Sequence, residues 1–291
     1  MSIVPGNPGQ HAIGDSAPAT SRRRARALRI LKRCPLSAWF GLIVIAAYVA
    51  IAVLAPVIAP YGEAEVAGNQ YEVLSEQFFF GTDQLGRDML SRLIYGARNT
   101  IGIALLTTCL SFAIGGMLGL LASVLGGWTD QLLARLVDVL MAIPQLIFAL
   151  VLLSLFGASL FNLVLIIAVL DSTRVFRLSR AVAMNVVVMD FVEAARLQGE
   201  GLLWIVTREV LPNILPPLVA EFGLRFCFVF LMISALSFLG LGIQPPTADW
   251  GSMVRENATL IAYGDVTPLL PAGAIALLTV AGNFVVDWFL Q

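Results

Sequence analysis

The sequence predicts an all-α protein that crosses a lipid bilayer several times, and its composition is the main reason. Hydrophobic residues make up 58% of the chain, charged residues only 13%, and the mean hydropathy is +0.87. A soluble globule of 291 residues could not bury so much apolar side chain. In hydrocarbon, a helix of about 20 apolar residues spans the membrane and satisfies its own backbone polar groups. A bundle of such helices is therefore the expected fold.

Apolar runs along the chain predict about six transmembrane helices. Residues 1–35 are rich in Gly, Pro, Ser and Ala and end in a basic cluster, which predicts a disordered cytoplasmic tail. The apolar run that follows is too long for the core of a signal peptide, so it is expected to be a retained anchor. An external loop at 60–98 then leads into a membrane domain at 99–291. The predicted spans are 36–59, 99–125, 136–156, 160–176, 213–241 and 268–290.

The fourth predicted span is the least regular. Only residues 160–170 are free of charge, and such a short stretch cannot cross a bilayer alone. We expect this helix to be tilted or partly buried in protein. Asp171 and Arg174, which follow the apolar stretch, are expected to mark a membrane boundary.

Basic residues set the predicted orientation, because cytoplasmic segments carry the excess of Lys and Arg. With the N-terminus inside, most of these residues are cytoplasmic, including the cluster from Arg22 to Arg33. The loop at 60–98 instead carries six acidic residues, Glu63, Glu65, Glu72, Glu76, Asp83 and Asp88. We therefore expect both termini to be cytoplasmic.

The sequence excludes several kinds of catalysis. The one histidine, His11, lies in the polar tail, so neither a histidine-based zinc motif nor a Ser-His or Cys-His pair can be built. Lys32 is the sole lysine, which excludes a nucleotide-binding loop of the G-x-x-x-x-G-K-[ST] kind. We expect no catalytic residue, no cofactor and no metal, and another subunit must supply any energy. Three cysteines are expected to be packing residues, namely Cys34, Cys109 and Cys227.

Two features within the predicted spans each leave two interpretations open. Small residues recur at every fourth position of the second span, which indicates close helix packing or a groove that lines a pore. Glu221 and Arg225 lie one helical turn apart in the fifth span, where a charge is costly. They are expected to form a structural ion pair or to line a translocation path. The small residues are Thr107, Ser111, Gly115, Gly119 and Ser123.

A polar island at 186–212 separates two of the spans. Its first part is expected to be a helix from residue 186 that presents Ala194 and Ala195 as a smooth patch. Gly199 and Gly201 are expected to break this helix, and Pro212 to end a second, shorter one through Trp204 and Ile205. Such a bent element fits either the groove of a partner protein or, as an amphipathic helix, the membrane surface.

Three motifs, which together lie in a region from about Pro35 to the end, resemble those of bacterial ABC importer permeases. The island resembles the cytoplasmic loop with which these permeases dock into their ATPase subunit. Residues 80–98 look like the external signature of the dipeptide, oligopeptide and nickel permeases, and residues 236–251 are similar to the segment after the fifth span of that family. The matching residues of the docking loop are Glu193, Ala194, Ala195, Gly199, Leu211 and Pro212, and those of the external signature include Gly81, Thr82, Asp83, Gly86, Arg87 and Asp88.

The resemblance is greatest to the C-type, or second, permease subunit of a dipeptide-type system, and it carries several implications. It implies a type I importer bundle in a bacterial inner membrane that works by alternating access, driven by closure of the ATPase pair. The implied partners are a second permease subunit in a heterodimer, two ATP-binding subunits, and a periplasmic or extracellular solute-binding protein, with no nucleic acid. Peptides are the implied substrate, and nickel complexes, opines or other small solutes are the alternatives.

Two other classes of protein fit the sequence less well. An ion-coupled carrier that acts alone would ordinarily show an internal repeat and several ionisable residues at mid-membrane, where only Glu221 and Arg225 are found. An intramembrane enzyme would need a usable histidine, a zinc site or paired intramembrane acids.

Overall fold

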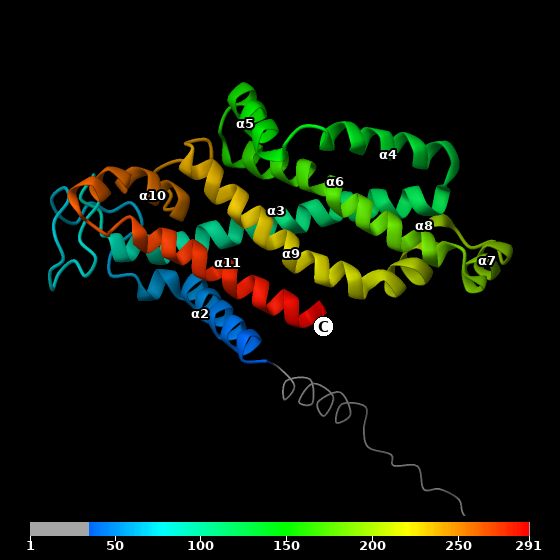
Figure 1. The fold of residues 1–291 in the computed structure, drawn as a ribbon, viewed down its shortest axis with the longest axis horizontal. Helices are drawn as coiled ribbons and strands as arrows, with labels where there is room; N and C mark the ends of the chain where they lie inside the picture. The colour runs from blue at the N-terminus through cyan, green and yellow to red at the C-terminus, as the bar shows by residue number, and fades with distance from the viewer. Residues whose placement is uncertain (1–34, 291) are drawn as a thin grey trace, which may run out of the picture. The chain divides into compact units, whose positions relative to one another are not determined.

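The computed structural model describes residues 35–290, and within them the chain forms helices, loops and isolated β-bridges but no strand (Figure 1). This confirms the all-α fold class. The tail predicted at 1–35 lies, apart from Pro35, outside the described residues. The elements are α2 Leu36–Ile58, α3 Met89–Leu125, α4 Gly127–Met141, α5 Gln145–Phe156, α6 Leu160–Val187, α7 Asp190–Leu197, α8 Leu202–Trp204, the π-helical η1 Ile205–Val210, α9 Leu211–Phe238, α10 Trp250–Asn257, the 3₁₀ segment η2 Ala258–Tyr263, and α11 Leu269–Leu290.

Four helical stretches of the described chain are long and apolar enough to cross a membrane. They are α2, α3, the continuous helix Leu202–Phe238 and α11, and a fifth is present if α4 and α5 together form one bent span. Helix α6 has 28 residues, which is long enough, but charged residues interrupt its second half. The count of six spans therefore stays a prediction.

The third predicted span, 136–156, is wrong as a single helix. Helices α4 and α5 meet at an angle of 86° around Pro144, which begins a new helical turn because its nitrogen has no hydrogen to donate. Helix α3, which contains the second predicted span, begins at Met89, and the loop before it ends at Asp88. The start of the span itself stays a prediction. The first turns of α3 were missed because Arg92 and Arg98 make them too polar to resemble a span.

Helices α3 and α6 form the closest pair of the bundle and run parallel. A methyl group on Gly115 would overlap the carbonyl oxygen of Ser172, and one on Gly119 would overlap the hydroxyl of Ser179. The small residues of α3 thus allow the two backbones to approach closely, which replaces the hydrophobic drive that lipid does not supply. Of the two interpretations of these residues, close helix packing is the one that the structure supports.

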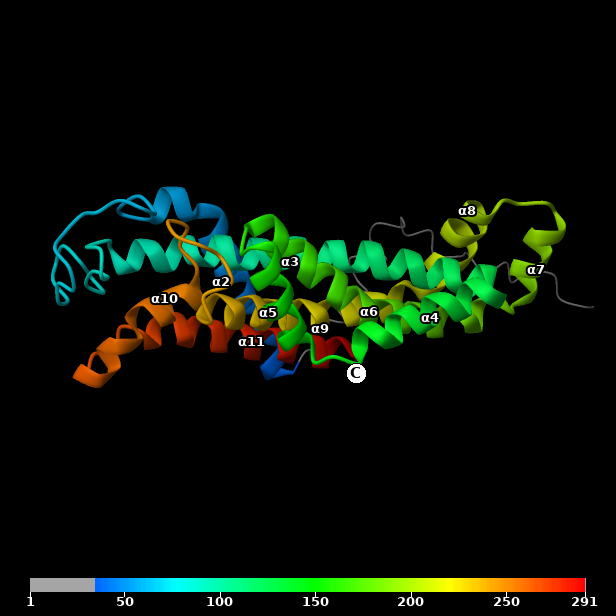
Figure 2. The same cartoon turned by 90° about the horizontal axis from the view of Figure 1, so that it is seen from above.

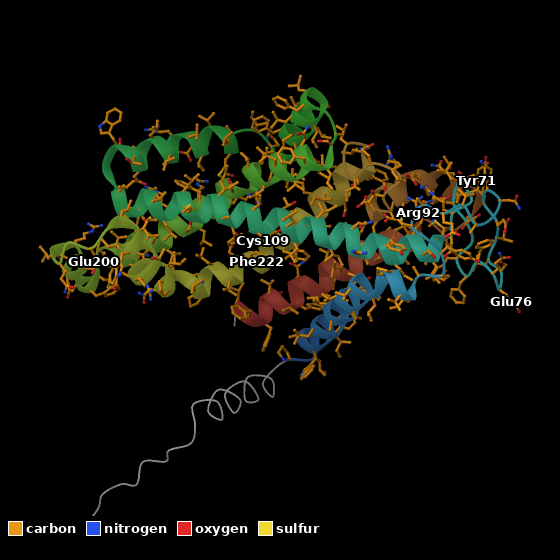
Figure 3. All side chains as sticks on the ribbon, turned by 180° about the vertical axis from the view of Figure 1, so that it is seen from behind. Tyr71, Glu76, Arg92, Cys109, Glu200 and Phe222 are labelled. Atoms are coloured by element: carbon orange, nitrogen blue, oxygen red, sulfur yellow. The ribbon has the colours of Figure 1, made fainter. Side chains whose placement is uncertain are left out.

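The described helices belong to the compact unit Ser37–Gln291, apart from the first residue of α2, and the unit has two distinct ends. Figures 1 and 2 show α7 and α8 at one end, and α10 with the loop at 60–88 at the other. We call these the α7 end and the loop end. Figure 3 places Tyr71 and Glu76 at the loop end and Glu200 at the α7 end.

Candidate functional site

Helix α7 stands out at the α7 end because a defined turn reverses the chain after it. The amide of Glu200 donates to the Ala195 carbonyl at 3.1 Å, and the amide of Gly199 donates to the Arg196 carbonyl at 3.0 Å. These two bonds make a Schellman cap, in which the residue after the helix takes a left-handed conformation. Gly199 has φ +83°, as this cap requires. The break predicted at Gly199 is confirmed.

One face of α7 is packed against the bundle. Val192 and Ala195 are buried in an apolar cluster that includes Val210 and Ile214. The guanidinium of Arg196 donates to the carbonyl of Val124 at 3.2 Å, in the last turn of α3. The prediction of a smooth exposed patch at Ala194 and Ala195 is therefore wrong for Ala195, because the helix buries that side. The helix also begins at Asp190, after a turn at 188–189, and not at residue 186.

The other face of α7 is free and mixes one acid with apolar side chains. Glu193 and Ala194 are exposed, and so are Phe191 (42%) and Leu197 (83%). Large apolar side chains rarely gather on a surface unless a partner or a membrane covers it. Helix α7 is thus packed against the bundle on one face and free to contact a partner on the other.

Pro212 does not end a helix, contrary to the prediction. Helix α8, the π-helical segment η1 and α9 run on continuously from Leu202 to Phe238, and Pro212 lies in the first turn of α9. Pro212 has no N–H to donate to the preceding turn, and that turn is the π-helical segment Ile205–Val210, where the α-helical hydrogen-bond pattern is already interrupted. Leu211 is half-buried and Pro212 is exposed. Both lie within the continuous helix Leu202–Phe238, so the end of the predicted docking loop is helical.

At the loop end, the external signature forms a compact turn that precedes α3. Gly81 and Gly86 have positive φ angles of +72° and +75°, and a side chain on either would overlap a backbone carbonyl of the loop. The hydroxyl of Thr82 accepts from the amide of Glu72 at 2.8 Å and donates to the carbonyl of Asn69 at 2.6 Å. These residues hold the loop in one shape.

A buried ionic cluster joins this turn to α10. Asp83 accepts from Arg87 at 2.7 Å and from Arg92 at 2.6 Å, and both guanidiniums lie 3.3 Å from Glu256 of α10. All four side chains are at most 6% exposed, and Figure 3 shows Arg92 next to the loop end. Burial raises the pKa of Glu256, an effect that Arg87 partly opposes. Asp88 caps α3 by accepting from the amide of Ser91 at 2.8 Å.

The segment after α9 is fixed to the same region. Asp249 caps α10, accepting from the amide of Ser252 at 2.9 Å and from the hydroxyl of Thr100 at 2.9 Å. Burial raises the pKa of Asp249. The indole of Trp250 donates to the Leu93 carbonyl at 2.9 Å. The external signature at 80–98 and the segment at 236–251 thus contact each other, which the sequence alone did not indicate.

In the middle of the bundle, Glu221 and Arg225 form an ion pair of 2.8 Å, as one of the two interpretations predicted. A third group joins them, because Asp171 of α6 lies 3.7 Å from Arg225 and accepts from Ser111 of α3 at 2.9 Å. The expectation that Asp171 marks a membrane boundary is wrong, since this side chain is 1% exposed and buried between three helices. Arg225 is 7% exposed, and its guanidinium also lies 4.7 Å from the ring centroid of Phe228.

Sequence reasoning missed three residues of these clusters. Asp249 caps α10 and Glu256 lies within it, and both are more than 140 residues from their partners on α3. Arg92 lies within the external signature at 80–98, but nothing in the sequence shows that its side chain turns inward. No group of three or more metal-ligating side chains occurs among residues 35–290.

The bundle has apolar helices long enough to cross a membrane, a helix with one free face at the α7 end and a fixed loop at the other end, as a membrane component of a transport system would. The family described as "Binding-protein-dependent transport system inner membrane component" matches residues 111–291, and the chain belongs to it. The N-terminal transmembrane domain of oligopeptide transport permease C matches residues 24–74. The chain is therefore a C-type permease subunit of the dipeptide and oligopeptide family, a multi-pass protein of a bacterial inner membrane.

Individual relatives cover most of the chain. The di/tripeptide transport system permease protein DppC of Pseudomonas aeruginosa is 37% identical over 254 residues, which are 85% of this chain and 84% of the relative. The dipeptide transport system permease protein DppC of Haemophilus influenzae is 35% identical over 86% of this chain and 87% of its own length. That of Alkalihalophilus pseudofirmus is 33% identical over 85% of this chain and 82% of its own length.

Proposed function

We propose that this chain is a permease subunit of an ATP-driven ABC importer that takes up dipeptides and oligopeptides, and that α7 couples it to the ATPase. The free face of α7 is the main observation in support, because it offers Glu193 among apolar residues while its other face is fixed to α3 and α9. The names of the relatives, which describe dipeptide and di/tripeptide transport, support the substrate.

The proposed complex contains a second permease subunit, two ATP-binding subunits and a solute-binding protein. The ATP-binding subunits hydrolyse ATP, and this chain is not itself catalytic. The α7 end faces the cytoplasm in this proposal, and the loop end faces the solute-binding protein. Closure of the ATPase pair would pull α7, and with it the continuous helix Leu202–Phe238, from one packing of the bundle to the other.

The translocation path is proposed to pass the face of α9 that carries Glu221. The Glu221 side chain is 20% exposed, whereas Arg225 is nearly buried, so Arg225 acts mainly by holding the charges of Glu221 and Asp171 in place. An arginine between two carboxylates lowers the cost of keeping each of them within the membrane.

Reconstitution in lipid vesicles tests the proposal. The complete complex, supplied with its binding protein, should accumulate a labelled tripeptide when ATP is present, and the isolated chain should release no phosphate from ATP. Failure of the complete complex to import any di- or tripeptide would overturn the substrate, and ATP turnover by the isolated chain would overturn its role as a non-catalytic subunit.

A variant of Glu193 tests the coupling role separately. Glu193→Lys should leave membrane levels unchanged, because the residue is exposed and lies outside the spans. It should reduce uptake and binding-protein-stimulated ATP hydrolysis about tenfold or more, because a charge-assisted contact contributes about 1.5–3 kcal/mol. Glu200→Lys makes the same change of charge in the turn that follows α7 and serves as the control. Normal uptake by Glu193→Lys would remove α7 from the coupling mechanism.

A further inference from the structure

Helix α6 carries an exposed arginine that has no acidic partner within 4 Å among residues 35–290. The other arginines of α6 have acidic partners: Arg177 lies 3.6 Å from Asp138, and Arg180 pairs with Asp130. Arg225 of the adjacent helix α9 pairs with Asp171 and Glu221. Arg174 forms no such ion pair, although it lies one helical turn from Asp171 and its side chain is exposed.

Arg174 lies near the middle of the bundle in the direction that crosses the membrane. Asp171 bonds to Ser111, which is near the centre of the apolar run 101–125 of α3, and pairs with Arg225, near the centre of α9. Three residues along a helix correspond to a rise of about 4.5 Å, so Arg174 is close to the same depth. A guanidinium at this depth costs at least about 2.5 kcal/mol when it faces lipid. Arg174 therefore faces either a water-filled path or another protein.

A small cavity beside Arg174 favours the path. It has a volume of about 100 Å³, and its lining joins Thr173 and Arg174 of α6 to Met141, Pro144 and Gln145 at the break between α4 and α5. Broken helices occur at membrane depth where the backbone lines a cavity, and they often form the substrate sites of transporters. The break between α4 and α5 thus lies beside Arg174, where a broken helix could line a translocation path.

The polar groups around this cavity suit an anion. Arg174 supplies up to five N–H donors and the Gln145 amide two more, while no acidic residue lines the cavity. The planar guanidinium matches a carboxylate, with which it forms two parallel hydrogen bonds. A cavity of about 100 Å³ holds a carboxylate but not a whole peptide.

We propose that Arg174, assisted by Gln145, binds the C-terminal carboxylate of a peptide as it passes through the membrane. This inference rests on the proposed function, since every unmodified linear peptide carries such a carboxylate. The carboxylate loses water of hydration when it enters the bundle, and the guanidinium offsets part of that cost.

The test uses the complete complex in vesicles with binding protein loaded to equal occupancy. Arg174→Gln keeps a hydrogen-bonding side chain but removes the charge, Arg174→Lys keeps the charge but not the bidentate geometry, and Arg177→Gln is the matched control one turn along α6. We expect Arg174→Gln to assemble normally, to keep stimulated ATP hydrolysis, and to import a tripeptide about tenfold more slowly. Arg174→Lys should fall between it and the wild type, and Arg177→Gln should transport normally.

A tripeptide with an amidated C-terminus separates the carboxylate from the rest of the substrate. The wild-type complex should import the free acid about tenfold faster than the amide, and Arg174→Gln should import both at similar rates. Wild-type rates of free-acid import by Arg174→Gln would overturn the inference while leaving peptide uptake by the complex intact. Loss of subunit assembly in both Arg174→Gln and Arg174→Lys, with normal assembly of Arg177→Gln, would also overturn it and assign Arg174 to a subunit interface.

Discussion

Single residues decide how closely α3 and α6 approach, and at Gly115 a side chain would meet the backbone of α6. Gly115→Ala should lower the stability of the protein by about 1–3 kcal/mol, because the added methyl group meets the Ser172 backbone and forces the helices apart. Gly116→Ala is the matched control, since a methyl group there meets nothing within 4 Å and alanine is the better helix former. Thermal unfolding of the two purified variants measures the difference. Equal melting temperatures would contradict the close contact.

Glu256 makes a prediction about pH, because burial raises its pKa above the ordinary value. A carboxyl group with a raised pKa costs more to ionise in the folded protein than in the unfolded chain. Its stabilising contribution is therefore complete below the unfolded pKa of about 4.3 and is lost as the pH rises through the higher folded pKa. Compared with the wild type, Glu256→Gln should show a melting temperature that falls less over this rise in pH. Parallel melting curves for the two proteins against pH would contradict the raised pKa.

At the scale of the element, the turn after α7 fixes the direction in which the chain leaves this helix. Gly199→Val should loosen α7 and reduce coupled uptake severalfold, because a β-branched residue resists the φ of +83° that the cap requires. Gly201→Val is the matched control, since Gly201 has an extended backbone with φ −73° and open space around it. Peptide uptake and copurification of the ATPase subunits measure the effect. If both valine variants behave alike, the shape of the turn does not matter for coupling.

The sequence predicted which elements exist better than where they end. Apolar runs mark α2, α9 and α11 well, because lipid-facing helices must be apolar along their whole length. The start of α3 and the break at Pro144 were missed, since both depend on packing outside or between apolar runs. Pro212 was misjudged because a proline can also lie within a continuous helix, here directly after a π-helical turn.

The candidate site was predictable where it depends on local geometry and unpredictable where it depends on distant partners. The ion pair of Glu221 and Arg225 follows from their spacing of four residues on one helix. The approach of Asp171 to Arg225, and of Glu256 to Arg87 and Arg92, is set by how helices far apart in sequence cross. A single sequence contains no signal for such crossings.

At the scale of the whole molecule, the two ends differ in what holds them together. The loop end is fixed by the buried cluster of Asp83, Arg87, Arg92 and Glu256, and by the contacts of Asp249 and Trp250 with α3. The α7 end is fixed mainly by apolar packing of Val192 and Ala195, and by a hydrogen bond from Arg196. Apolar packing can slide between two arrangements more readily than a buried ionic cluster, which must exchange its partners. A firmly held loop end and an α7 end held by apolar packing are what the coupling role proposed for α7 requires.

The same two ends give the prediction for orientation. The basic cluster from Arg22 to Arg33 precedes α2, and α2 leads into the loop at 60–88, so the loop end should be external and the α7 end cytoplasmic. In a variant with its native cysteines replaced, Glu76→Cys should react with a membrane-impermeant maleimide added outside intact spheroplasts. Gln198→Cys, also exposed, should react only after the membrane is permeabilised. Both cysteines should react fully in detergent, which controls for accessibility. Labelling of Gln198→Cys from outside, with Glu76→Cys protected, would reverse the orientation and would place α7 where no cytoplasmic ATPase could reach it.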